Sequence, residues 1–368
     1  MPRRTATLLA SLLTLIALLC AGVLIPVPYA EMSPGLTVNT LGKHEGETVL
    51  RITGQKTYPT SGHLNMTTVQ VTNSEYKMNL VESVYGWLSH DKLVVPHKTL
   101  YPDDKSADEV NQENAEEFTQ SQESAKVAAL KELKKRKLLD VKLTSHTVVG
   151  SVAKGAPAEG ILHAGDAIKA VDGEAVRTPA DVVKLVSQHK PGDKTVFTVI
   201  PAERVAAAEK QRKEPRGAKN VTLTTMRAPQ EDRAMIGIEA AVDYTLPFDI
   251  SITVRDVGGP SAGLMFSLGI IDKLTPGDLT GGEFVAGTGT IAEDGTVGPI
   301  GGISMKTVGA RNKGATYFLT PEANCPTAAR DIPDGLTLVK VATLDDAMDA
   351  LEKIREKKTA DLPSCTRG

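Results

Sequence analysis

The sequence predicts an α+β protein of several domains, tethered by an apolar helix near its N-terminus. The chain has 368 residues, a length typical of about two or three domains. Hydrophobic residues make up 41% and charged residues 24%, so wholesale disorder and a polytopic membrane fold are both disfavoured. The net charge of −3 gives no basic footprint, and no nucleic-acid partner is expected.

The cysteines and histidines exclude several kinds of site. The 3 cysteines are too few for a disulfide-dense small fold or for a zinc site built from four cysteines. The sequence therefore suggests neither a metal nor another cofactor. The last of the 7 histidines is His189, so everything beyond it lacks an imidazole.

Residues 1–30 are expected to form a cytoplasmic tip and a single-pass membrane anchor. Arg3 and Arg4 precede an uncharged stretch whose apolar centre covers residues 6–25. About 20 helical residues, at about 1.5 Å each, cross a hydrocarbon core of ~30 Å. Because the positive charges precede the span and Glu31 follows it, we expect the rest of the chain outside the cytoplasm, with the lipid bilayer as a partner.

A cleaved signal peptide is the alternative for this stretch. The apolar region of a signal peptide is usually shorter, ~7–15 residues, and Pro28 stands where an A-x-A cleavage site needs a small residue. We favour the uncleaved anchor. Under either interpretation the bulk of the chain is exported. Since Cys20 lies inside the apolar stretch, we expect Cys325 and Cys365 to form a disulfide rather than remain two unpaired thiols.

Residues 31–142 are expected to form a small, β-rich, membrane-proximal region. Short strands separated by turn residues are predicted over 37–39, 48–53 and 67–72. Apolar side chains at helical spacing then predict an amphipathic helix over 125–139. Trp87, the single tryptophan, is expected to pack inside this region.

Residues 143–228 show a pattern of strands around a helix. Val171-Asp172-Gly173 ends a strand in a tight turn, and Thr178-Pro179 supplies an N-cap and a proline at the first helical position. With Gly165-Asp166 and Pro191-Gly192-Asp193, these residues resemble a PDZ domain of the kind associated with bacterial proteases. A charged segment, 203–220, is inserted before the last strand.

The PDZ resemblance implies a peptide-binding module. Such a domain adds an extended peptide as a strand at a sheet edge and holds the peptide carboxylate with backbone N–H groups. We expect the loop that does this to precede Val148, near residues 144–147.

The segment 249–274 carries the first candidate for chemistry. Alternating apolar residues predict a strand over 249–255, Gly258-Gly259 ends it, and Pro260 suits the first position of a helix. Ser261 is therefore expected in the first helical turn. Unpaired N–H groups there favour the negative charge of a developing oxyanion.

The catalytic base is expected to be a lysine. The segment 259–263 also fits the G-x-S-x-G nucleophile elbow of α/β-hydrolases, but that fold needs a histidine after the serine, and none follows His189. Lysine is the remaining base for a serine nucleophile. Lys306 is expected in the first turn of a helix capped by Ser304. The helix dipole and burial both lower the pKa of a lysine there. A catalytic lysine needs its pKa to fall from ~10.4 to roughly 7–8 to act as a base at neutral pH.

The two blocks together resemble the proteolytic domain of Lon proteases. The nucleophile block of that family is matched by Gly259, Pro260, Ser261, Ala262 and Gly263, and its lysine block by 301–306. The resemblance covers about residues 234–357. It implies an α+β domain, here 229–368, in which Ser261 and Lys306 form a catalytic dyad.

The family resemblance also gives a role to Thr288, whose side chain is expected to orient the lysine. In one respect the sequence departs from the family. An aspartate often stands shortly before Gly-Pro-Ser, whereas this chain has Gly258-Gly259 there, and Asp256 is only a weak substitute.

The order of anchor, PDZ-like domain and Lon-like domain is similar to that of bacterial membrane-anchored PDZ/Lon-type proteases. The sequence contains no P-loop, so an ATP-independent enzyme is predicted. We expect a serine endopeptidase that cuts flexible segments of exported or membrane proteins, with the PDZ-like domain selecting or gating them. A homo-oligomer is suggested only by analogy with Lon rings.

The alternative function is a membrane-tethered peptide-binding scaffold that has lost catalysis. The presence of both Ser261 and Lys306 argues against it, because a decayed site has little chemical reason to keep both.

Overall fold

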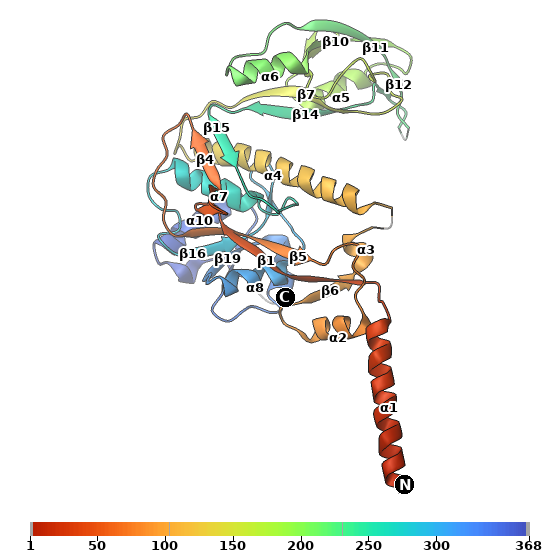
Figure 1. The fold of residues 1–368 in the computed structure, drawn as a ribbon. Coiled ribbons are helices and arrows are strands. Elements are labelled where there is room, and N and C mark those ends of the chain that lie inside the picture. Colours follow the sequence, from red (N-terminus) through yellow and green to blue (C-terminus); the bar gives the residue numbers. More distant parts are fainter. Residues whose placement is uncertain (1–2, 103, 230, 366–368) are drawn as a thin grey trace. The chain divides into compact units, whose positions relative to one another are not determined.

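The computed structural model describes residues 3–102, 104–229 and 231–365, and Figure 1 shows its ribbon. The chain divides into two compact units. The first combines Met1–Asp140 with Phe248–Gly368, and the second is Val141–Pro247. The first predicted domain begins and the last predicted domain ends in segments that lie outside the described residues, namely 1–2 and 366–368.

The N-terminal helix α1 (Arg3–Leu24) begins the first unit. Its residues Arg4–Leu24 form a helix that is long and apolar enough to cross a membrane. A signal sequence meets the same test of length and composition.

A 6-stranded sheet forms the centre of the first unit, in the order β20-β19-β16-β5-β1-β6. Its strands are β1 (Tyr29–Asn39), β5 (His63–Val71), β6 (Leu93–Pro96), β16 (Phe284–Gly287), β19 (Tyr317–Pro321) and β20 (Thr337–Val341). β1 pairs antiparallel with β5 and β6, whereas β16, β19 and β20 run parallel to β5. The two ends of the chain therefore share one sheet.

The structure divides the chain differently from the predicted domains. Strands from the predicted membrane-proximal region, 31–142, lie in the sheet of the C-terminal residues, because β16 pairs with the edge that the β1–β5 pair leaves open. The second unit extends past the predicted boundary at residue 228 to Pro247, since β14 (Ile238–Thr245) joins its sheet.

Two helices contact the strand β5 at the centre of the sheet, namely α7 (Gly263–Leu274) and α8 (Ile303–Asn312). A third helix, α4 (Ala107–Lys135), begins with a capping box between Ser106 and Glu109 and packs along α7. The helix predicted over 125–139 is thus part of a longer helix that begins at Ala107 and ends earlier than predicted, at Lys135; Figure 1 shows α4 beside α7.

The remaining elements of the first unit connect these layers. They are β2 (Lys43–His44), β3 (Glu47–Thr48), β4 (Leu50–Thr53), α2 (Leu80–Leu88), α3 (His97–Leu100), β15 (Asp249–Ile252), β17 (Thr290–Ile291), β18 (Val297–Gly298), η1 (Glu322–Asn324), α9 (Cys325–Ala328), α10 (Leu344–Arg355) and η2 (Thr359–Asp361).

Trp87 does not pack inside the first unit as expected. Its side chain is 53% exposed, and its ring makes an edge contact with the ring of Tyr29, with 5.4 Å between the centroids. The helix that carries it, α2, buries its small residues Ser83 and Gly86 instead.

The second unit is built on a sheet in the order β11-β10-β8-β7-β14. Its elements are β7 (Thr144–Val152), β8 (Ala167–Val171), β9 (Glu174–Ala175), α5 (Pro179–Ser187), β10 (Lys194–Ile200), α6 (Ala202–Lys210), β11 (Lys219–Thr224), β12 (Met226–Arg227), β13 (Ala234–Met235) and β14. As predicted, Thr178 caps α5, in a capping box with Asp181.

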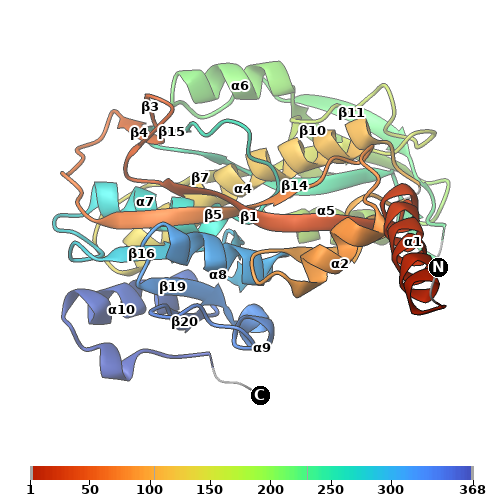
Figure 2. The ribbon, with the colours of Figure 1, turned by 60° about the horizontal axis from the view of Figure 1, so that its bottom comes forward.

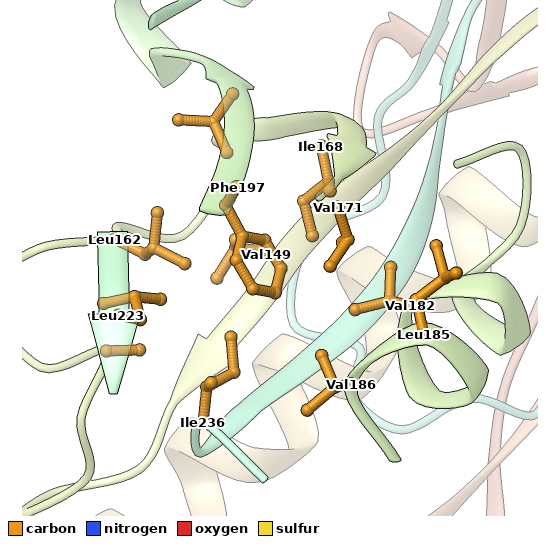
Figure 3. Packing of buried hydrophobic residues seen from close by; sticks show 12 residues of the cluster. Val149, Leu162, Ile168, Val171, Val182, Leu185, Val186, Phe197, Leu223 and Ile236 are labelled. Atoms are coloured by element: carbon orange, nitrogen blue, oxygen red, sulfur yellow. The ribbon is translucent and has the colours of Figure 1, made fainter. Parts of the chain in front are cut away.

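A hydrophobic core lies between this sheet and α5 (Figure 3). Phe197 on β10 and Val171 on β8 are fully buried at its centre, and Val182 and Val186 reach it from α5. The predicted charged insertion over 203–220 contains most of α6, whose Val205 is buried in a smaller apolar cluster.

Cys325 and Cys365 form a disulfide in the structure, with their Cα atoms 5.0 Å apart. Cys325 begins α9, and both cysteines lie in a hydrophobic cluster with Phe318 and Leu338. The bridge fixes the C-terminal segment, where Lys340 N also donates to Pro363 O at 2.7 Å.

The disulfide leads to a prediction about stability. The double variant Cys325→Ala/Cys365→Ala should lose about 2–4 kcal/mol of unfolding free energy, because the bridge closes a loop between residues 40 positions apart. Urea unfolding with and without reductant measures this, and Cys20→Ser is the control that should change nothing. A wild-type protein insensitive to reductant would indicate two unpaired thiols.

Candidate active site

Ser261 and Lys306 meet in the first unit. The Lys306 Nζ lies 2.7 Å from the Ser261 Oγ, 3.0 Å from the backbone oxygen of Thr67 and 3.2 Å from the Thr288 Oγ1. Lys306 is only 2% exposed and Thr288 is fully buried. The predicted pair and the predicted orienting threonine therefore lie together, and Thr67 is a neighbour that sequence reasoning missed.

The hydrogen bonds around Lys306 fix the direction of its lone pair when the amine is neutral. A carbonyl can only accept, so the Thr67 oxygen takes one N–H of the amine. The Thr288 hydroxyl donates its own proton to the backbone oxygen of Ser261 at 2.9 Å and therefore accepts the second N–H. The lone pair is left facing Ser261 Oγ, which is the arrangement a general base needs.

Burial makes that neutral form accessible. Desolvation lowers the pKa of Lys306 from 10.5 to about 7. In the described part of the chain, each side-chain or backbone group that hydrogen-bonds to Nζ is uncharged, so no carboxylate holds the ammonium form in place. A substantial fraction of the amine is thus unprotonated near neutral pH.

The loop before α7 presents Ser261 to the lysine. The helix begins at Gly263 with Ala262 as N-cap, so Ser261 lies just before the helix rather than in its first turn as expected. A Cβ at Gly263 would come within 2.6 Å of Ile291 Cγ2, which explains why this position is a glycine. The backbone oxygen of Ser261 is further held by Gly289 N at 2.9 Å.

The N-terminus of α7 supplies polar groups beside the nucleophile. The first N–H groups of a helix have no partner within the helix, and Ala262 caps α7 without a side-chain hydrogen bond. Leu264 N donates to Gly289 O at 3.1 Å, so the N–H of Gly263, at the very start of α7, is the one suited to bind an oxyanion on a carbonyl attacked by Ser261. Upstream, Gly259 N donates to Asn114 O of α4 at 2.8 Å, which anchors the start of the loop.

Lys306 is positioned by the start of α8. The structure differs from the expectation that Ser304 caps this helix: Gly302 is the N-cap, with φ 68°, and the helix begins at Ile303. Gly302 adopts this left-handed conformation at no steric cost, and its carbonyl accepts from Lys306 N at 3.1 Å. Lys306 remains in the first turn, where the helix dipole also disfavours its charge.

The supporting residues of the nucleophile block surround Ser261 as neighbours in the loop. Pro260 uses its backbone oxygen to accept from Ser121 Oγ of α4 at 2.8 Å. Asp256 has an exposed side chain. Ser121, like Thr67 and Asn114, comes from the N-terminal part of the chain, and none belongs to a recognisable sequence motif.

A hollow of about 240 Å³ lies beside Pro260. One wall is a polar face of α4, and the other is formed by Thr290 and Ile291. The α4 residues that line it are Glu117, Gln120, Ser121 and Ser124.

The second unit offers a sheet edge for peptide binding, although not where the sequence suggested. Residues 144–147 form part of β7 and pair with 242–245 of β14, so they do not form a free loop. β14 is the last strand of this sheet, and β14 and β13 both contact α5. β11 is the terminal strand at the other side of the sheet, so the outer edge of β14 is the terminal edge that lies beside α5.

Comparison with known protein families finds a match in each of the two units. Residues 250–353 match the Lon protease (S16) C-terminal proteolytic domain, and residues 126–208 match the PDZ domain. The chain therefore contains a PDZ domain and a Lon-type proteolytic domain. The first lies mostly in the second compact unit, and the second contributes Ser261, Thr288 and Lys306 to the site.

Individual relatives agree with the Lon assignment. Lon protease 1 of Bacillus subtilis is 34% identical over 122 residues, which cover 31% of this chain and 15% of that protein. Lon protease 2 of the same organism is 34% identical over 97 residues, covering 26% of this chain and 17% of the relative. This chain thus spans less than a fifth of the length of these relatives.

Among solved structures, the PDZ domain of an SdrC-like protein from Listeria innocua is 22% identical. The alignment covers 26% of this chain and 92% of that chain, with a TM-score of 0.21.

Burial of Lys306 predicts a pH dependence of stability. Its folded pKa, about 7, lies below the ordinary 10.5, so the unfolded chain binds more protons between these values and stability rises with pH in that window. Lys306→Met should remove this rise, which amounts to at most about 5 kcal/mol. Urea unfolding from pH 7 to 10 measures the difference in slope.

The matched control is Lys313→Met, since Lys313 is exposed at the end of α8. The slope of its unfolding free energy against pH should equal that of the wild type. A Lys306→Met slope identical to both would show that Lys306 is charged in the folded protein.

Proposed function

We propose that the first unit is a serine endopeptidase in which Ser261 is the nucleophile and Lys306 the general base. The observation that carries this is the neutral-amine geometry, in which two N–H groups are bound and the lone pair faces Ser261 Oγ at 2.7 Å. The match of residues 250–353 to the Lon proteolytic domain supports the same reaction.

The proposed reaction proceeds by acyl transfer. Ser261 Oγ forms a bond to the carbonyl carbon of the substrate while its proton moves to Lys306 Nζ. The N–H of Gly263 at the start of α7 binds the oxyanion. The C–N bond then breaks, and the ammonium of Lys306 gives its proton to the leaving amine. Water then adds to the acyl carbon while one of its protons moves to Lys306 Nζ. The bond between Ser261 Oγ and the acyl carbon breaks, and the Lys306 ammonium returns its proton to Oγ, which releases the acid and restores both side chains.

We further propose roles for the PDZ domain and for the helix α1. The PDZ domain binds an extended peptide along the outer edge of β14, since that edge lies beside α5. The helix α1 anchors the chain in a membrane with the remaining residues outside the cytoplasm, which its length, its apolar composition and the two arginines at its start support. The substrates are exported or membrane proteins with flexible segments, cut without ATP.

The first test compares the full chain with single variants in nucleotide-free buffer, using an unstructured fluorescent polypeptide as substrate. Ser261→Ala and Lys306→Met should each lower kcat/KM by at least about a thousandfold, because the dyad acts as a unit. The matched controls Ser304→Ala and Lys313→Met should retain activity. Addition of ATP should leave the wild-type rate unchanged.

The outcomes separate the two candidate functions. Cleavage by Ser261→Ala at the wild-type rate would remove the dyad from the reaction. A wild-type protein that binds peptide but cuts no substrate would leave the tethered scaffold as the function.

A second test concerns the ionisation of the base. Since the neutral amine is the active form, kcat/KM should rise as the pH increases through about 7. Thr288→Val removes a hydrogen-bond acceptor that favours the ammonium form of Lys306, so the rise of kcat/KM should move to lower pH. In the same variant kcat should fall, because the lone pair of the amine is less well directed toward Ser261. Thr288→Ser should restore both. A pH profile unchanged in Thr288→Val would exclude a positioning role for Thr288.

A further inference from the structure

The short helix α2 (Leu80–Leu88) has its large apolar side chains on the outside. Leu88 is 77% exposed and Tyr85 is 61% exposed. The exposed apolar side chains of this helix are Leu80, Val81, Val84, Tyr85, Trp87 and Leu88.

The inner face of α2 is made of small residues. Its buried residues are Ser83 and Gly86. A Cβ at Gly86 would come within 2.5 Å of Val94 Cγ2 on β6, so the helix lies too close to the sheet for a larger side chain. This is the reverse of an ordinary surface helix, which turns its apolar face to the core.

The position of α2 is fixed against the end of α1. A Cβ at Gly22 would lie 3.2 Å from Val81 Cγ2, Val27 N donates to Met78 O at 2.8 Å, and Pro26 forms a β-bridge with Asn79. Figures 1 and 2 both show α2 beside the C-terminal end of α1. The apolar surface of α1 therefore continues onto α2.

We propose that α2 docks on the lipid bilayer, with its outer face in the boundary between headgroups and acyl chains. This rests on the proposed anchoring by α1. A helix of 22 residues is about 33 Å long, close to the ~30 Å hydrocarbon core, so its C-terminal end at Leu24 reaches the outer boundary. Because α2 packs on Gly22, it lies at the same depth.

The side chains of α2 fit that depth. Tyr85 and Trp87 are the residue types that gather at membrane interfaces, where the ring is apolar and its polar atom meets water. Lys92 has its Nζ 5.3 Å from the centroid of the Tyr85 ring and pairs with Glu31 at 2.9 Å. Leu88 and Val84 supply the apolar area that an interfacial helix buries.

The test uses Trp87 as its own probe, since it is the single tryptophan of the chain. The full chain is reconstituted in phosphatidylcholine vesicles carrying a spin label either near the headgroup or near the end of the acyl chain. Trp87 fluorescence should shift to shorter wavelength, and the shallow label should quench it more than the deep one. Val84→Glu/Leu88→Glu should weaken both effects, whereas Leu138→Glu, at an exposed apolar site after α4, should not.

A tryptophan away from α2 provides the second control. In Trp87→Phe/Tyr58→Trp, the probe lies in a loop bonded to the end of α7 through Tyr58 N and Lys273 O, and α7 is far from α1 in Figures 1 and 2. Neither lipid label should quench it.

Three outcomes would overturn the proposal, and they are distinguishable. If the protein floats with the vesicles but lipid labels spare Trp87 while aqueous acrylamide quenches it, α2 faces water and only the docking fails. If neither quencher reaches Trp87, protein, such as a second copy of this chain, covers α2. If the protein does not float, the proposed anchoring fails and the docking with it.

Discussion

The burial of one amine beside one hydroxyl is the constraint on which the site depends. Lys306 lies among uncharged acceptors, and these low-polarity surroundings destabilise the charged form of its amine. A carboxylate placed next to Nζ would hold the ammonium and remove the lone pair. The absence of such a group among the described partners of Lys306 is therefore as important chemically as the presence of Ser261.

The acceptors that direct this amine come from distant parts of the chain. Thr67 belongs to β5, which pairs in parallel with β16, and β16 leads directly to Thr288. The sheet register thus brings a backbone oxygen from the N-terminal part and a hydroxyl from the C-terminal part to one nitrogen. Residues 250–353, which match the Lon proteolytic domain, do not include Thr67. The N-terminal strands are part of the compact unit that holds Ser261 and Lys306, although they lie outside that match.

The sequence predicted what local chemistry encodes. The Gly-Pro-Ser-Ala-Gly block and the lysine block predicted that Ser261 and Lys306 meet, and the two side chains lie 2.7 Å apart. Thr178-Pro179 predicted the start of α5, because that signal lies within a few residues. The sequence did not predict the Thr67 oxygen or the outer edge of β14. A backbone carbonyl has no side-chain signature, and a sheet edge depends on pairing between residues far apart, such as Ile238 with Val152. Trp87 is exposed because α2 lies against β6 through small residues, Ser83 and Gly86, which leaves its larger side chains on the outer face.

The same strands that complete the site also connect it to α1. β1 begins at Tyr29, shortly after α1 ends at Leu24, and lies between β6 and β5 in the sheet. The Thr67 carbonyl that binds Lys306 is therefore one strand away from the strand that leaves α1. If α1 spans a bilayer, little flexible chain separates the membrane from this sheet. Thr67 lies opposite Thr37, which is about 26 Å along extended β1 from Tyr29. A membrane protein would then need an extended segment of about that reach to arrive at Ser261, which favours flexible segments over the interior of a folded domain.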